Sequence, residues 1–222
     1  MSFKKLNIGE NHVFIIAELS ANHGGSKARA LEVVHAAAEA GADAVKFQHY
    51  TDQTITVRSN HPDFRVSGGT LWDGRQLADL YAEAMMPWEW TQDLVAAAKK
   101  AGIDWLSSPF DNSAVDFLEA FNIPTYKIAS FELNDLPLIR YVASKGKPMI
   151  MSTGMSNIDE ITFALANVFF GRLSQNMPTS SQEVWAFWNH MMQDNAALDD
   201  VCLLHCHSEY PTPLRSANML AI

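Results

Sequence analysis

Two lysines lie inside short apolar runs, where charged side chains are uncommon. Lys46 occurs in AVKFQ and Lys127 in TYKIAS. A buried lysine needs an acidic partner or a bound anion, because an isolated buried charge is costly. Hydroxyl groups and a glycine amide follow other apolar runs and could complete an anion site: Ser108, Ser130, Ser152, Thr153 and Gly154. This pattern favours an anionic ligand such as a phosphate, and a Schiff base on a lysine is the alternative chemistry.

A carboxylate, Glu18, ends the first apolar run, in IIAELSANHGGS. Asn22, His23 and two glycines follow directly, which predicts a tight turn that carries hydrogen-bonding side chains. Glu18 could be a structural partner of Lys46. It could equally be a general base that acts on water or a hydroxyl group beside the anion site.

The last apolar run carries His205 and His207, whose spacing on one strand face suits metal ligands. Two histidines alone are weak evidence for a metal. Cys202 and Cys206 would lie about 13 Å apart on an extended strand, too far for a disulfide. Free cysteines indicate a reduced, cytoplasmic protein.

Apolar, β-rich runs alternate with helix patterns along the whole chain. The runs are 13–17, 44–47, 104–107, 125–129, 148–152 and 201–205. The helix patterns are 26–40, 76–84, 88–101, 112–121, 135–145 and 157–170. Ser26 and Asn157 are typical N-cap residues, and glycines follow several of the helix patterns. The alternation predicts a parallel sheet with helical crossovers.

Two folds fit such a series of strand and helix units: an open doubly wound sheet, or part of a (β/α)8 barrel, which needs about 250 residues. The polar residues discriminate between them, because they fall at the carboxyl ends of the runs. In a barrel these ends converge on one mouth, where active sites lie. We therefore predict an α/β TIM barrel that is incomplete here, with about six βα units.

Two stretches interrupt the alternation. Residues 51–75 form a long polar loop that contains GGTLWDG, and loops of this length are usually functional or disordered. In 171–200, the sequence SQEVWAFWNHMMQD places aromatic residues and methionines on one helical face. This face could pack on the exterior of the barrel or on a partner subunit, and a ligand-gripping aromatic box is the alternative.

Composition excludes several classes of function. The chain has 222 residues and a net charge of −9, so it has no electrostatic footprint for nucleic acid or an anionic membrane. No apolar run reaches the roughly 18 residues of a transmembrane helix. The first residues carry two lysines but no apolar stretch typical of a secretory signal.

Seven ordered motifs resemble the sialic acid synthase family, whose members condense phosphoenolpyruvate with an amino sugar. They are AELSANHGGS, VKFQHYT, SSPFD, AVDFLE, YKIASFE, GKPMIMSTGM and LLHCHSEYPTP. GGTLWDGRQLADLYAEAMMPWEW and the ending ANMLAI look most like the pseudaminic acid synthase branch. The resemblance covers about 1–170 and 200–222.

The resemblance implies a (β/α)8 barrel followed by a small antifreeze-like domain, in a swapped homodimer. It also implies a divalent metal, Mn²⁺ or Mg²⁺. C3 of phosphoenolpyruvate would attack the open-chain aldehyde of an acetamido sugar, water would add at C2, and phosphate would leave. The product is a nine-carbon 2-keto acid related to sialic acid.

The family's roles transfer to this chain motif by motif. Glu18 would be the catalytic base. The resemblance assigns phosphoenolpyruvate to Lys46, Ser108, Lys127, Ser130, Ser152 and Ser208, and the sugar to Asn22, His23, Gln48 and Tyr210.

The sequence departs from the family pattern in three ways. After LLHC the family usually has threonine and then serine or asparagine, whereas this chain has His207 and Ser208. An insertion occupies about 172–199. The family's two metal-binding histidines belong to the last two barrel strands, which this sequence does not reach, so its own weak candidate is His207. We therefore expect residues 1–222 alone to associate and to be inactive.

Three functions remain open at this point. The first is a pseudaminic acid synthase, and the second is an N-acetylneuraminate or legionaminate synthase. The third is an inactive paralogue that binds a sugar or a partner through the helix around 185–192.

Overall fold

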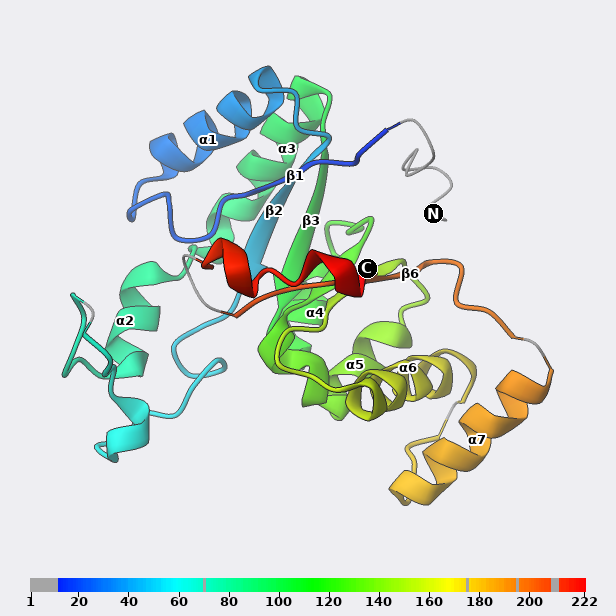
Figure 1. Cartoon of the computed structure of the whole chain (residues 1–222). Coiled ribbons are helices and arrows are strands. Elements are labelled where there is room, and N and C mark those ends of the chain that lie inside the picture. Colours follow the sequence, from blue (N-terminus) through cyan, green and yellow to red (C-terminus); the bar gives the residue numbers. More distant parts are fainter. Residues whose placement is uncertain (1–11, 70, 175, 195, 209–211) are drawn as a thin grey trace. The chain divides into compact units, whose positions relative to one another are not determined.

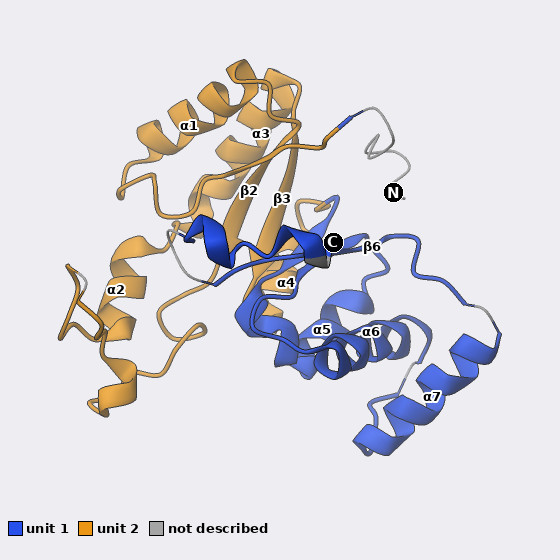
Figure 2. Ribbon diagram, viewed as in Figure 1, with its two compact units in different colours: residues 1–12, 124–222 blue, residues 13–123 orange. Residues whose placement is uncertain are grey.

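The computed structural model describes residues 12–69, 71–174, 176–194, 196–208 and 212–222 (Figure 1). They form two compact units, which Figure 2 distinguishes by colour. Unit 2 consists of 13–123, and unit 1 consists of 124–222 with His12. None of the helices in the described part of the chain is long and apolar enough to cross a membrane.

Unit 2 holds three parallel strands that pair in chain order: β1 (Ile16–Glu18), β2 (Ala44–His49) and β3 (Asp104–Pro109). Its helices are α1 (Lys27–Glu39), α2 (Leu77–Ala84), α3 (Thr91–Ala101) and α4 (Asn112–Glu119), with short 3₁₀ turns η2 (Pro62–Phe64) and η3 (Trp88–Trp90). Helices α1 and α3 pack against each other, α1 also contacts β2, and α3 contacts β3.

Local sequence explains where these helices begin and end. The Ser26 hydroxyl accepts a hydrogen bond from the backbone N–H of Arg29 and caps α1. Asp111 caps α4 in the same way through the backbone N–H groups of its first turn. Gly102 ends α3 with a φ of 77°, a left-handed conformation that a side chain would disfavour.

Unit 1 holds the other three described strands, which also pair in parallel and in chain order: β4 (Tyr126–Ile128), β5 (Met149–Ser152) and β6 (Val201–Leu204). Its helices are α5 (Leu136–Ala143), α6 (Ile158–Leu173) and α7 (Ser181–Gln193), with 3₁₀ turns η4 (Ser130–Asn134), η5 (Leu214–Ser216) and η6 (Met219–Ala221).

Helix α6 is the centre of packing in unit 1. Asn157 and Glu160 form a reciprocal capping box at its start. Gly171 lets α6 approach α5 closely, because a Cβ there would lie 2.5 Å from the carbonyl oxygen of Arg140. Arg172 is ion-paired with Asp200 and donates to the carbonyl of Lys147, 3.1 Å away, which ties α6 to the segments that enter β5 and β6.

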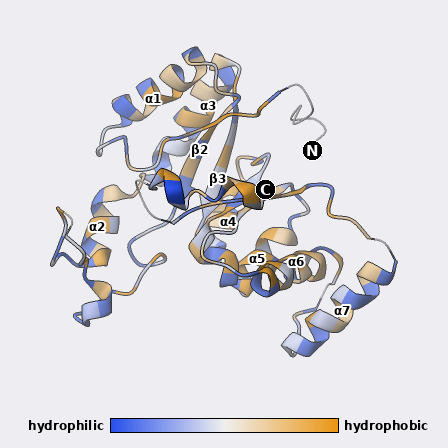
Figure 3. Ribbon diagram, viewed as in Figure 1, coloured by the Kyte–Doolittle hydropathy of each residue, from blue (hydrophilic) through white to orange (hydrophobic). Residues whose placement is uncertain are grey.

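Helix α7 is the element expected within 172–199, and it packs on α6. Val184 is buried in a cluster with Ala166 and Phe170, and Trp185 stacks on Phe163 with ring centroids 4.9 Å apart. Figure 3 shows hydrophobic and hydrophilic bands along this helix. These contacts support external packing within unit 1.

The alternative aromatic box gains no support from the space beside α7. An apolar cavity of about 280 Å³ lies there between α6, α7 and β6, lined by Leu165, Phe169, Trp188, Met192, Ala196, Leu198, Val201 and Leu203. The lining carries no titratable side chain that would select a polar ligand.

The predicted alternation of parallel strands and helices is confirmed. The strand β1 starts at Ile16 rather than at Val13, because Val13 is exposed and the amide of Ile15 bonds to the carboxylate of Asp43 instead of a strand partner. Residues Trp88–Trp90 form a 3₁₀ turn rather than the start of α3. The long loop contains an antiparallel bridge between Arg65 and Gln76.

Candidate active site

In unit 2 the carboxyl ends of β1 and β2 place a carboxylate beside a lysine. Glu18 and Lys46 are direct partners in the strand register, and Glu18 Oε2 is ion-paired with Lys46 Nζ. Lys46 is 15% exposed in its side chain and Glu18 is 37% exposed. Glu18 Oε1 accepts a hydrogen bond from the amide of Ser20 at 3.0 Å. The carboxylate is thus held in place but remains open to solvent.

The next register position of β2 and β3 adds polar groups to the same end of the sheet. Gln48 lies opposite Ser108. The Ser108 hydroxyl is buried and has no hydrogen-bond partner among the described residues. A buried hydroxyl without a partner is costly, so a ligand that accepts its hydrogen bond would be stabilised here.

A buried histidine that the sequence analysis did not single out, His49, connects the strands at this end of the sheet. His49 Nδ1 lies 2.7 Å from the Ser107 hydroxyl and Nε2 lies 2.8 Å from the Thr91 hydroxyl. Burial lowers the pKa of His49 to about 3. The neutral ring therefore ties β2 to β3 and to α3, next to the site residues Gln48 and Ser108.

The turn after β1 carries Asn22 and His23, which the sequence predicts to line the sugar side. Asn22 is exposed. His23 is fully buried, its Nδ1 accepts from the amide of Gly25 at 3.0 Å, and its ring packs edge-on against Trp90. Burial lowers the pKa of His23. These contacts support a structural role for His23 within the turn, and its contact with a sugar stays a prediction.

In unit 1 the second lysine is buried and points at a hydroxyl group. Lys127 Nζ donates to the Ser152 hydroxyl at 2.5 Å and to the carbonyl of Ile128 at 2.8 Å. Both of these acceptors are neutral, and Lys127 also lies close enough to Glu132 to lower the pKa of that carboxyl group. A charged ammonium group in such surroundings favours an anionic ligand.

Three segments of unit 1 meet next to this lysine. The Ser130 hydroxyl accepts from the amide of Gly154 at 3.2 Å. A Cβ on Gly154 would lie 2.7 Å from the Ser208 hydroxyl and 2.8 Å from the Ser130 hydroxyl. The Ser208 hydroxyl is buried and has no hydrogen-bond partner within the described part of the chain. We call Lys127, Ser130, Ser152, Gly154 and Ser208 the anion cradle.

Gly154→Ala should weaken anion binding while it costs little stability. The added methyl group would displace the two hydroxyls, which can rotate away, so the loss falls on the ligand and not on the core. We expect affinity for phosphate-bearing ligands to fall about 10-fold, the value of one charge-assisted hydrogen bond. Calorimetric titration of the full-length protein measures this.

Gly41→Ala is the matched control, because Gly41 has a φ of 84° and no atom near its missing Cβ. We expect that variant to lose thermal stability through backbone strain and to keep its affinity. Equal affinities for the two variants would contradict the cradle.

The structure adds a carboxyl group that the sequence did not single out. Glu132 lies in η4, two residues after the cradle residue Ser130, and its Oε2 is buried without a hydrogen-bond partner among the described residues. The pKa of Glu132 is raised to about 7, chiefly by burial and also by Asp135, while a backbone hydrogen bond and Lys127 act in the opposite direction. The sequence shows an acidic residue after a strand, but only tertiary packing shows that it is buried.

The carboxyl end of β6 carries the two histidines. His205 Nε2 donates to the carbonyl of Ala217 at 2.8 Å. Thr153 donates through its amide and its hydroxyl to the carbonyl of Leu204, which fixes β5 beside β6. Tyr210 lies outside the described residues.

Comparison with known proteins places these motifs in a family. The sequence profile described as the NeuB family matches residues 33–222. The chain belongs to the NeuB family. This match covers the strand ends that carry Lys46, Ser108, Lys127, Ser130, Ser152 and Ser208.

Individual relatives of this NeuB chain cover almost all of it. A pseudaminic acid synthase of Campylobacter jejuni is 39% identical over 96% of the chain and 54% of the relative. An N,N'-diacetyllegionaminic acid synthase of the same species is 31% identical over 94% of the chain and 55% of the relative. The chain therefore spans about half the length of the curated relatives it matches.

A solved structure is similar in fold. The N-acetylneuraminic acid synthetase of Leptospira borgpetersenii, crystallised with citrate, is 26% identical. It aligns with a TM-score of 0.73 over 96% of this chain and 61% of its own. The parallel α/β architecture of this NeuB chain is thus shared with that synthetase.

The resemblance to the family implies a metal site, but the described side chains do not form one. Within the described ranges, no three His, Cys, Asp or Glu side chains lie close enough together to hold a metal ion. His205 is engaged with a backbone carbonyl. The side chains described in this NeuB chain therefore do not fit a divalent metal.

Proposed function

We propose that this chain is part of an enzyme that condenses phosphoenolpyruvate with an open-chain acetamido sugar. The product would be a nine-carbon 2-keto acid of the pseudaminic acid type, with release of phosphate. The observation that carries the proposal is the anion cradle, where the Ser130 and Ser208 hydroxyls lie beside Gly154 and the buried Lys127 donates to the Ser152 hydroxyl. The higher identity to a pseudaminic acid synthase than to a legionaminic acid synthase favours that branch.

Phosphoenolpyruvate carries two anionic groups, and each unit offers a lysine. In unit 1 Lys127, Ser130, Ser152 and Ser208 would donate hydrogen bonds to one of them. In unit 2 Lys46 and the Ser108 hydroxyl would serve the other. The resemblance to the sialic acid synthase family assigns the residues of both units to phosphoenolpyruvate.

The first chemical step forms the bond between the two substrates. C3 of phosphoenolpyruvate attacks the aldehyde carbon, and the electron pair of the carbonyl moves onto its oxygen, which needs a proton. Glu132 holds a proton near neutral pH because its pKa is about 7. We assign Glu132 as the proton donor, because a general acid works best when its pKa lies near the operating pH.

The second step adds water at C2 and expels phosphate. Glu18 would take a proton from the attacking water, whose oxygen bonds to C2, and Lys46 would hold the carboxylate in position. As the bond between C2 and the phosphate oxygen breaks, the remaining proton of the C2 hydroxyl passes to the departing phosphate, which leaves the 2-keto group and inorganic phosphate. Gln48 and Asn22 would contact sugar hydroxyls.

Other parts of the family pattern stay proposals for the whole protein. They are a divalent metal, a homodimer and a contribution of Tyr210 to sugar binding. The free cysteines Cys202 and Cys206 and the use of phosphoenolpyruvate favour the cytoplasm.

A phosphate-release assay on the full-length protein tests the proposal. Phosphoenolpyruvate is supplied with manganese or magnesium and with acetamido sugars of different configuration. We expect phosphate to appear only when phosphoenolpyruvate and a sugar are both present. Release at the same rate without sugar, or no release with any acetamido sugar, would contradict the function.

Glu132→Gln should lower turnover about 10²-fold and should change how stability depends on pH. The folded protein keeps a proton on Glu132 that the unfolded chain loses above its ordinary pKa of 4.5. The stability of the wild type therefore falls as pH rises from about 4.5 through 7. The glutamine variant lacks this loss, so its melting temperature should exceed that of the wild type increasingly between pH 5 and 8.

Thermal unfolding measured across this pH range checks the expectation. Glu89→Gln is the control, because Glu89 is exposed in the same chain. Parallel stability curves for the Glu132 variant and the wild type would mean that Glu132 is not a buried acid.

A further inference from the structure

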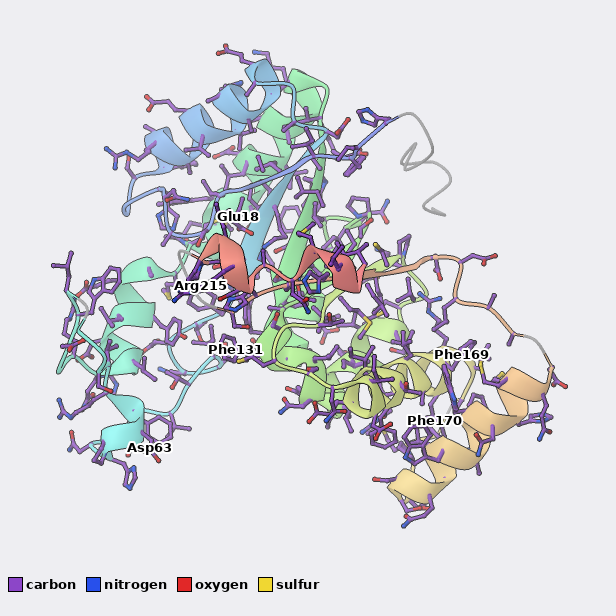
Figure 4. All side chains as sticks on the ribbon, in the orientation of Figure 1. Glu18, Asp63, Phe131, Phe169, Phe170 and Arg215 are labelled. Carbon is purple, nitrogen blue, oxygen red and sulfur yellow. The ribbon has the colours of Figure 1, made fainter. Side chains whose placement is uncertain are left out.

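Two exposed apolar side chains border the anion cradle of unit 1. Phe131, labelled in Figure 4, is 68% exposed, and Met155 is 67% exposed. Phe131 directly follows the cradle residue Ser130, and Met155 directly follows Gly154. The amide of Gly154 donates a hydrogen bond to the Ser130 hydroxyl. Phe131 and Met155 therefore each follow one partner of this hydrogen bond.

The backbone conformation at Met155 carries an energetic cost. Met155 has a φ of 65°, a left-handed conformation that is unfavourable for a residue with a side chain. Strained residues of this kind gather at ligand sites. Phe131 and Leu133 both belong to η4, which follows β4. Leu133 is buried while Phe131 is not, and η4 packs against β5 and α6. The turn therefore buries Leu133 and presents the Phe131 ring to solvent.

We propose that Phe131 and Met155 form an apolar rim that binds a methyl group of the sugar acceptor. This rests on the proposed function, because it takes the cradle to hold phosphoenolpyruvate. The aldehyde must then lie beside the cradle to react, and the next part of the sugar reaches the rim. An aromatic ring and a thioether favour a methyl group over a hydrated hydroxymethyl group.

Two substituents of an amino sugar could supply that methyl group: an acetamido group or a deoxy carbon. Phe131 and Met155 would therefore determine specificity for acetylated or deoxygenated sugars. Phe131 and Met155 would not touch the reacting atoms, so they should act on sugar binding and not on the chemical step.

The test uses the variants Phe131→Ala and Met155→Gly in the full-length protein. Each should raise KM for the sugar about 10-fold, the lower end of what one methyl group is worth in an apolar pocket. The kcat and the KM for phosphoenolpyruvate should stay within about twofold. Phe131→Tyr keeps an aromatic ring and should therefore keep the wild-type KM for the sugar. Met155→Gly should also raise the melting temperature, because glycine accepts the positive φ.

Leu173→Ala is the control, because Leu173 is an equally exposed apolar residue at the C-terminal end of α6. Unchanged sugar KM in both rim variants, as in the control, would overturn the proposal. Comparing sugars that lack only the acetyl group or carry only a hydroxymethyl group then identifies which methyl group binds.

Saturation-transfer NMR separates this inference from the proposed reaction. With the sugar and phosphoenolpyruvate present, the sugar methyl protons should receive the strongest saturation in the wild type and lose it in Phe131→Ala. That result supports the rim even if no phosphate is released. Turnover with equal methyl saturation in both proteins would leave the proposed function standing and refute the rim.

Discussion

Glu18→Gln should lower turnover by about 10²–10⁴-fold while phosphoenolpyruvate still binds. Glutamine keeps the size of the side chain and its ability to accept from the amide of Ser20, but it cannot take a proton from water. Lys46 loses its ion-pair partner, which leaves its charge available to the substrate. The loss should therefore fall on kcat, measured by phosphate release, and not on the dissociation constant measured by calorimetry.

The control is Asp93→Asn, which removes the carboxylate of another ion pair in unit 2. Asp93 pairs with Lys27, and both side chains are largely exposed. Exposed pairs contribute little, so this variant should keep wild-type turnover. If Glu18→Gln also keeps its turnover, Glu18 is only the structural partner of Lys46. A collapse of phosphoenolpyruvate binding would mean that the ion pair shapes the site and does not supply a base.

The fold was largely predictable because its signals are local. The apolar run that contains Lys46, and the other apolar runs that end in hydroxyl residues, predicted strands within a few residues of their observed bounds. The caps at Ser26 and Asn157 are formed as expected. The predicted helix start at Trp88 and the predicted extent of β1 were wrong. Strand pairing and 3₁₀ geometry depend on neighbouring segments that the local sequence pattern does not contain.

The site was predictable in part, and for a physical reason. Lysines within apolar runs must find a partner, so Lys46 and Lys127 could be recognised from their position alone. The roles of Glu132, Phe131 and His49 depend on how deeply each side chain is buried, which is a property of the packed structure. His23 shows the reverse case, because a polar residue in a predicted turn proved to be fully buried.

Lys127→Met should weaken phosphoenolpyruvate binding by about 10–150-fold. Methionine keeps most of the apolar stem and removes the ammonium group, which bonds to Ser152 at 2.5 Å. A hydrogen bond to a charged group is worth about 1.5–3 kcal/mol, which converts to that range of affinity. Because the wild type buries an ammonium group that donates to a hydroxyl and a carbonyl, which are neutral acceptors, the variant without ligand should be at least as stable as the wild type. Calorimetric titration and thermal unfolding of the full-length protein measure both effects.

Lys100→Met, on the exposed surface of α3, controls for the loss of one positive charge and should leave affinity unchanged. Two results would contradict the anion site. Equal affinity in both variants would make Lys127 structural. Borohydride trapping of a substrate on the wild type, absent from Lys127→Met, would indicate the Schiff base chemistry that the sequence left open. We expect no trapping, because the proposed reaction of phosphoenolpyruvate with the sugar aldehyde forms no Schiff base on a lysine.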